Sequence, residues 1–162
     1  MKAKKLAELS LLTAVATIIF IIELRIPNII PIPGIKLGLA NIIMVYAAYR
    51  FSAKDVLLIA VARVFLGSLF GGNFSVIIYS LSGALACLAG MLLLRKIIPL
   101  EYVWLCSIIG AILHNTGQMA AAIFITRTPA VLAYYPPLII SGSIAGLFTG
   151  LCAMFILKRV KS

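Results

Sequence analysis

The stretch VLLIAVARVFLGSLF, residues 56–70, carries a single charge, that of Arg63, near its centre. A run this apolar is typical of a helix that lies in lipid. A guanidinium at the middle of a bilayer costs about 2.5–3.5 kcal/mol on insertion scales, so it is expected to have a polar partner or a functional role. The chain has four acidic residues, each near the end of an apolar segment: Glu8, Glu23, Asp55 and Glu101. We therefore expect Arg63 to be partnered by carbonyls, amides, water or an anionic ligand.

The composition of the whole chain agrees with a protein that lipid surrounds. Hydrophobic residues make up 64% of the 162 positions, charged residues 11%, and the mean hydropathy is +1.19. An ordinary soluble domain has about 45–50% apolar and about 25% charged residues. The composition predicts an all-α integral membrane protein with one domain over residues 1–162. The three cysteines have unrelated spacings and form no Cys/His cluster, so neither a metal site nor a cofactor is expected.

The apolar segments predict a six-helix transmembrane bundle. A span needs about 20 helical residues, fewer inside a bundle. The segment with Pro27, Pro31 and Pro33 is predicted to be a loop, because proline removes a backbone donor and clashes with the preceding turn. The basic start resembles a signal peptide, but no clear cleavage site follows it, so the first helix is predicted to be retained. The expected helices lie near residues 5–23, 36–51, 53–70, 75–96, 102–126 and 133–158.

The basic residues predict the orientation of this bundle. Six spans place both termini on one side, together with the loops after the second and fourth spans. That side collects ten of the fourteen basic residues, and the other side holds Arg25, Lys36 and Arg127. By the positive-inside rule, both termini are expected in the cytoplasm. The net charge of +10 is then a topology signal, and no nucleic-acid partner is expected.

Small residues recur four positions apart on several of the expected helices. Such spacing lets helix backbones approach closely in lipid. Two interpretations stay open: packing inside this bundle, or docking of a partner membrane protein. The stripes are Gly142, Gly146 and Gly150; Ser82, Ala86 and Gly90; Gly67 and Gly71; and Ser10 and Ala14.

Polar residues inside two of the spans predict a binding pocket. His114 and Gln118 are one helical turn apart, so they share a face, and Asn115 flanks them. The helical rise of about 1.5 Å per residue puts Arg63 and His114 both near mid-depth. We expect a pocket that opens outward, has donors in excess and has no fixed negative charge. Such a pocket suits a carboxylate, a phosphate or electron-rich ring oxygens. Alternatively, these side chains only join helices.

Missing motifs argue against catalysis by this chain. It has no GxxxxGK[ST] loop for ATP and no clustered aspartates for magnesium and diphosphate. Its apolar spans carry no paired carboxylates, and no Ser/His/Asp set is apparent. The chain is therefore not expected to be an enzyme.

Three segments resemble the signature blocks of a known family: PGIKLGLANI at residues 33–42, RVFLG at 63–67 and HNTGQ at 114–118. They are similar to those of the Gx transporter family of small bacterial membrane proteins, also labelled heptaprenyl diphosphate synthase component I. That family resembles the substrate-binding components of energy-coupling-factor transporters, which are compact six-helix proteins. The resemblance implies a multi-pass protein of the bacterial cytoplasmic membrane. It also implies a vitamin-like ligand near the outer face, a transmembrane coupling subunit and two ATPase subunits as partners.

The resemblance also assigns residues. The docking of such components to the coupling subunit uses small residues on the first helix, for which Ser10 and Ala14 are the nearest equivalents here. Asn73 lies in the outer loop after the third span, and because of this position we include it among the expected pocket residues. The positions that match the family motifs, and so become candidate ligand contacts, are Lys36, Asn41, Arg63, His114, Asn115 and Gln118.

Three functions follow for testing. The first is a membrane-embedded substrate-binding and transport component for a small anionic or aromatic molecule, similar to a vitamin or quinone precursor. The second is an accessory membrane subunit of heptaprenyl diphosphate or quinone biosynthesis that has no active site of its own. The third is a membrane scaffold whose polar residues only hold helices together.

Overall fold

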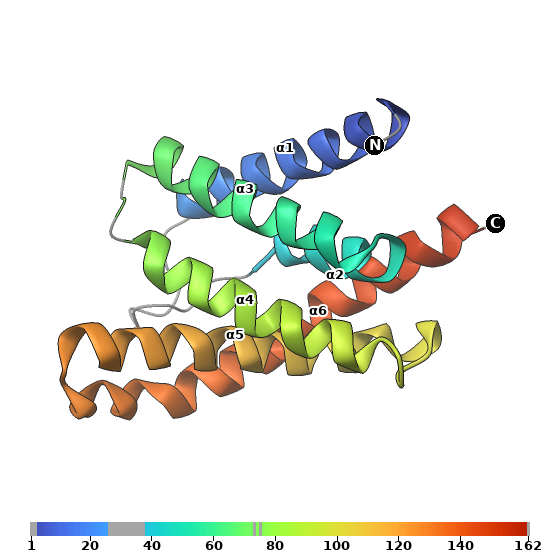
Figure 1. The fold of residues 1–162 in the computed structure, drawn as a ribbon. Coiled ribbons are helices and arrows are strands. Elements are labelled where there is room, and N and C mark those ends of the chain that lie inside the picture. Colours follow the sequence, from blue (N-terminus) through green and yellow to red (C-terminus); the bar gives the residue numbers. More distant parts are fainter. Residues whose placement is uncertain (1–2, 26–37, 73, 75, 162) are drawn as a thin grey trace.

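The computed structural model describes residues 3–25, 38–72, 74 and 76–161. Its described part is all-helical (Figure 1). Two short 3-10 helices, η1 (Leu100–Tyr102) and η2 (Pro129–Tyr134), precede the last two α-helices. The six α-helices are α1 (Ala3–Arg25), α2 (Asn41–Arg50), α3 (Ala53–Gly71), α4 (Val76–Leu94), α5 (Val103–Thr126) and α6 (Tyr135–Lys161).

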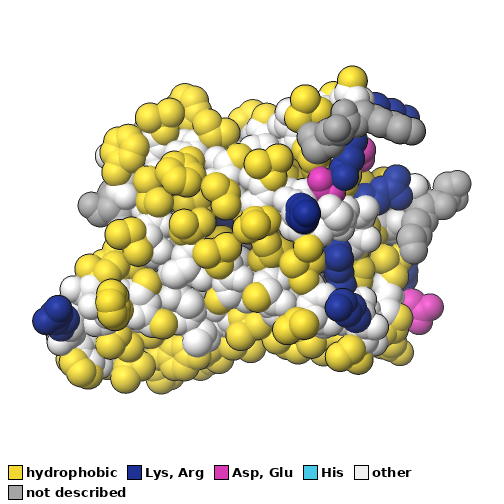
Figure 2. Space-filling model, in the orientation of Figure 1, with side chains coloured by type: hydrophobic (Ala, Val, Ile, Leu, Met, Phe, Trp, Pro, Cys, Tyr) yellow, Lys and Arg dark blue, Asp and Glu magenta, His cyan; other side chains and the backbone are white. Residues whose placement is uncertain are grey.

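Length and hydropathy make this a multi-pass membrane fold. Among the described residues, four stretches are long and apolar enough to cross a bilayer: Ala3–Glu23, Val76–Leu94, Leu100–Thr126 and Pro129–Val160. Helix α3 has 19 residues but contains Lys54, Asp55 and Arg63, and α2 has only 10 residues. Large apolar side chains cover much of the outer surface, as expected in lipid (Figure 2).

The start of α2 differs from the sequence prediction. The second helix was expected from about residue 36, but α2 begins at Asn41. Gly38 has a φ of +70°, a left-handed conformation that cannot be part of a right-handed α-helix and that glycine adopts without a steric cost. A turn over residues 39–40 follows, in which the Asn41 N–H donates to the Gly38 carbonyl at 2.8 Å. The other five helices begin and end within about three residues of their predicted bounds.

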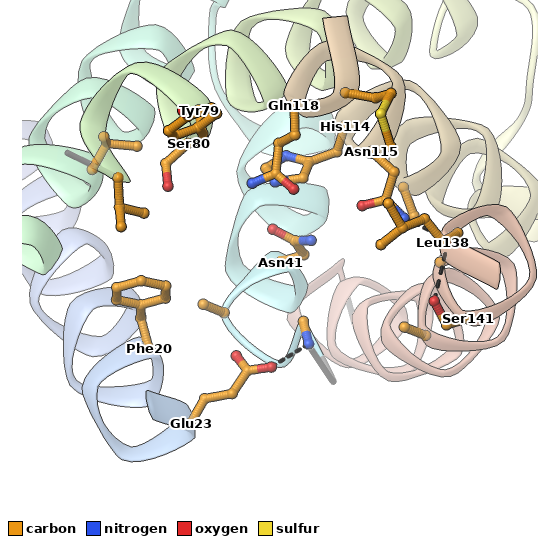
Figure 3. Close-up of a pocket in the computed structure, with 18 of the residues that line it drawn as sticks. Phe20, Glu23, Asn41, Tyr79, Ser80, His114, Asn115, Gln118, Leu138 and Ser141 are labelled. Carbon is orange, nitrogen blue, oxygen red and sulfur yellow. Dashed lines mark hydrogen bonds between the residues drawn. The ribbon is translucent and has the colours of Figure 1, made fainter. Parts of the chain in front are cut away.

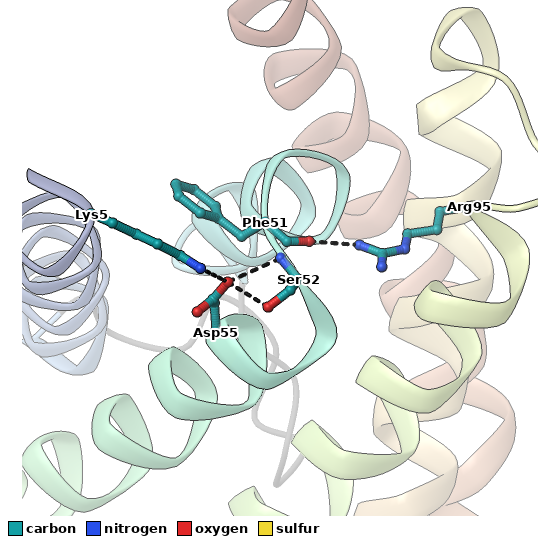
Figure 4. A network of polar contacts seen from close by, with 5 residues as sticks. All are labelled: Lys5, Phe51, Ser52, Asp55 and Arg95. Carbon is teal, nitrogen blue, oxygen red and sulfur yellow. Dashed lines mark hydrogen bonds and ion pairs between the residues drawn. The ribbon is translucent and has the colours of Figure 1, made fainter. Parts of the chain in front are cut away.

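Polar contacts join helix ends at one end of the bundle (Figure 4). Lys5 Nζ lies 2.7 Å from Asp55 Oδ2 and so connects α1 to the first turn of α3. The same carboxylate accepts hydrogen bonds from the Ser52 backbone N–H at 3.1 Å and from Ser52 Oγ at 2.5 Å. Arg95, after α4, donates to the carbonyls of Phe51, at 2.9 Å, and Ala48. Both chain termini lie at this end, which we call the basic end (Figure 1).

Two apolar clusters fill the half of the bundle next to the basic end. One joins α2 to α4, α5 and α6 and includes Val45, Met91 and Leu157. The other joins α1, α2 and α3 and includes Leu9 and Ile59. The helix halves far from the basic end belong to neither cluster, and they are the ones that carry the polar residues of the site.

Most of the small-residue stripes pack helices of this chain against one another. A Cβ built at Gly150 would lie 2.6 Å from Trp104 Cα, and one at Gly146 would lie 2.8 Å from Ile108 Cα, so α6 packs closely on α5. Between α4 and α5, Ser82 Oγ donates to the Gly117 carbonyl at 3.1 Å. Gly67 of α3 packs against the Phe20 ring of α1. Ser10 and Ala14 of α1, in contrast, are exposed.

Candidate functional site

A cavity of about 550 Å³ lies in the half of the bundle far from the basic end. All six α-helices and η2 contribute side chains to it. Its size falls within the range of about 300–1,000 Å³ that is usual for sites of small ligands. The described polar candidates from the sequence line this one cavity: Asn41, Arg63, His114, Asn115 and Gln118. Lys36 and Asn73 lie outside the described residues.

Arg63 brings a positive charge to the cavity from the middle of α3. Its side chain is only 9% exposed, and its Nη1 donates to Asn41 Oδ1 at 3.3 Å. Asn41 is the first residue of α2, so the turn at Gly38 that delays this helix also aims the amide at the guanidinium. The five donors of a guanidinium allow further hydrogen bonds to a ligand.

One face of α5 supplies the amide and imidazole groups. His114 and Gln118 pack against Gly83 of α4, where a Cβ would lie 2.7 Å from Gln118 Cγ. The glycine therefore provides the space that lets α4 pass beside these two side chains. Asn115 Nδ2 donates to the Leu138 carbonyl at 2.7 Å, so part of this amide is used to join α5 to α6.

Glu23 corrects the expectation that the pocket has no fixed negative charge. Its side chain lines the same cavity and is only 7% exposed, and Glu23 Oε1 accepts a hydrogen bond from the Gly38 backbone N–H (Figure 3). The sequence placed Glu23 at the end of a span, which is correct. The turn at Gly38, however, folds back against this end of α1 and buries the carboxylate inside the bundle.

Glu23 and Arg63 share the cavity without contacting each other. The ion pair that the structure records among its described residues is that of Lys5 with Asp55. Both charged groups of the cavity thus have neutral partners, the backbone N–H of Gly38 and the amide of Asn41.

Aromatic side chains form part of the wall of the cavity. Phe20 and Tyr79 both lie on the left in Figure 3, across the view from Asn115, with Tyr79 above Phe20 and Glu23 at the lower edge. Tyr134 of η2 also lines the cavity. Sequence analysis could not identify these rings as part of the site, because aromatic residues in an apolar span are equally typical of lipid contacts. Over the described ranges, no three His, Cys, Asp or Glu residues are arranged to hold a metal ion.

A comparison with protein families matches residues 12–156 to the model of heptaprenyl diphosphate synthase component I. The chain belongs to this family. Every described residue that lines the cavity falls inside the matched region. Searches of the curated proteins and of the solved structures found no significant match. The family's name describes one component of a system with several subunits.

Proposed function

We propose that this member of the family is a membrane-embedded substrate-binding and transport component for a small molecule that carries an anionic group. The observation that carries the proposal is the cavity itself, which is lined by amides from α2 and α5, by an imidazole from α5 and by the buried guanidinium of α3. A buried arginine beside an open volume, with a neutral amide as its recorded partner, favours recognition of a carboxylate or phosphate. The aromatic wall provides contact area for a ring.

The same proposal includes a topology. With six spans and both termini in the cytoplasm, the basic end obeys the positive-inside rule in the cytoplasmic membrane of a bacterium. The cavity, which lies toward the opposite end, then faces the outer side, where a substrate to be imported would arrive.

Transport from this site needs an energy source that the chain does not supply. Its sequence has no P-loop. We expect a transmembrane coupling subunit to contact the exposed Ser10 and Ala14 on α1, and two ATPase subunits to act through it. We expect no catalysis, because the described lining of the cavity has one carboxylate and so no pair of carboxylates for acid–base chemistry.

The test is thermal unfolding of the purified protein in detergent against flavins, other vitamins, quinone precursors and short prenyl diphosphates. A ligand that binds only the folded state adds about 2.7 kcal/mol of stability at a hundred times its dissociation constant. At least one compound should raise the midpoint, and Arg63→Gln should remove the shift. Arg50→Gln, which removes an exposed arginine from α2, should retain it. If no compound shifts the midpoint, or if Arg63→Gln binds as the parent does, the proposal is wrong.

A second function is favoured by the name of the family. The chain would then be an accessory membrane subunit in heptaprenyl diphosphate synthesis, with the active site on another protein. This function predicts that a soluble, aspartate-rich synthase co-purifies with the chain and makes a different product in its absence. If a ligand stabilises the chain and no synthase co-purifies with it, the result supports the transport component instead.

A further inference from the structure

Two buried charges of opposite sign face one cavity. Glu23 on α1 and Arg63 on α3 each have more than nine-tenths of their side-chain surface buried. Both line the cavity of about 550 Å³. The structure records no ion pair between them among its described residues.

Such an arrangement is costly without a further partner. A charge removed from water needs a countercharge or several hydrogen bonds, and the interior of a protein screens charges much less than water does. Glu23 has the Gly38 backbone N–H and Arg63 has the side-chain amide oxygen of Asn41, and both partners are neutral groups. A direct contact between the two side chains would satisfy both charges, but they do not lie within ion-pair distance of each other. Within the described part of the chain no other group supplies these countercharges, so they are expected from whatever fills the cavity.

We propose that the ligand is a zwitterion, whose anionic group binds Arg63 and whose cationic group binds Glu23. This inference rests on the proposed function and adds the cationic group to it. The two charged groups of the ligand are separated by an apolar, ring-containing body, which contacts Phe20 and Tyr79.

The charge balance distinguishes this ligand from a simple anion. Arg63 and Glu23 together contribute no net charge, so a zwitterion leaves the filled cavity neutral with every charge paired. A monoanion of the same size pairs Arg63 but leaves the carboxylate of Glu23 buried without a countercharge. Truncation of a buried charge partner is strongly unfavourable, so the site should discriminate between the two by about tenfold or more.

The experiment compares compounds that share one body and differ only in charge. One set is para-aminomethylbenzoate, para-methylbenzoate and para-methylbenzylamine; the other is para-aminomethylphenylacetate, para-methylphenylacetate and the same para-methylbenzylamine. Each compound is added to the full chain in detergent, and dissociation constants are obtained from the shifts in unfolding midpoint. The best zwitterion should bind about tenfold more tightly than its anionic analogue. In Glu23→Gln this preference should disappear, because the amide still accepts from Gly38 but carries no charge.

Controls separate this inference from the proposed function. Glu8→Gln removes the same charge from the same helix outside the cavity and should keep the preference for the zwitterion. Size-exclusion profiles show whether each variant remains folded. If the best ligand from these sets and the vitamin panel lacks a cationic group, or if Glu23→Gln keeps the preference, the zwitterion inference fails while the proposed function stands. If no compound of any charge binds, both fail.

Discussion

The close contact between α5 and α6 makes Gly150 a sensitive position. In Gly150→Ala the new methyl carbon would lie 2.6 Å from Trp104 Cα and 2.7 Å from Ser107 Cβ. Ordinary van der Waals contacts are about 3.5–4.0 Å, and the Trp104 atom belongs to the backbone, which cannot rotate away. The two helices must therefore separate locally, or the side chains around the contact must rearrange.

The expected loss of stability follows from two opposing terms. Overpacking costs about 1–3 kcal/mol, and we use the upper part of this range, about 2–3 kcal/mol, because the contact at Gly150 is with backbone. Replacing glycine by alanine inside a helix returns up to about 1 kcal/mol through helix propensity. The net loss is about 1–2 kcal/mol, which corresponds to a fall in the unfolding midpoint of about 2–8 °C for a chain of this size.

Tryptophan fluorescence is suited to this measurement, because the chain has one tryptophan and it lies at the altered contact. Circular dichroism in the same detergent provides a second, global probe. Ala120→Leu adds more volume at an exposed position of α5 and should change stability by no more than about 0.5 kcal/mol. If Gly150→Ala unfolds at the temperature of the parent protein, α5 and α6 are not packed as closely as described.

Two more predictions concern α1 and α5. Ala14→Leu enlarges an exposed residue of α1, so it should leave the unfolding midpoint unchanged but prevent co-purification of a transmembrane coupling subunit; a complex that survives this change would exclude the expected docking face. Asn115→Ala removes the hydrogen bond to the Leu138 carbonyl and should lower stability by about 0.5–1.5 kcal/mol in the same unfolding assay, so an unchanged midpoint would contradict that contact.

Much of the site could be predicted because a charge or an amide in an apolar span is costly and so conspicuous. Arg63 and the helical spacing of His114 and Gln118 indicated a shared cavity, and the structure brings these side chains together with Asn41. Glu23 was overlooked because its position along the chain is that of a span end. Its burial depends on the left-handed turn at Gly38, a conformation that glycine allows but does not require.

The aromatic wall could not be predicted for a related reason. In the sequence, Phe20 and Tyr79 cannot be distinguished from aromatic residues that face lipid. Only the three-dimensional packing decides whether such a ring lines the cavity. The small-residue spacing gave two interpretations, and it carried no information on which stripe faces a neighbour. In α6 the stripe contacts α5, whereas in α1 Ser10 and Ala14 face outward.

In the half of the bundle that holds the cavity, the helices are unequally packed. On one side, α4, α5 and α6 approach each other backbone to backbone through their glycines. On the other side, Glu23 and Arg63 hold the start of α2 by single hydrogen bonds. A ligand that contacts both sides would act as a non-covalent crosslink between a stiff group and a loosely held one. Occupancy should then be reported most strongly by slower amide hydrogen exchange at Gly38 and Asn41, far from the basic end.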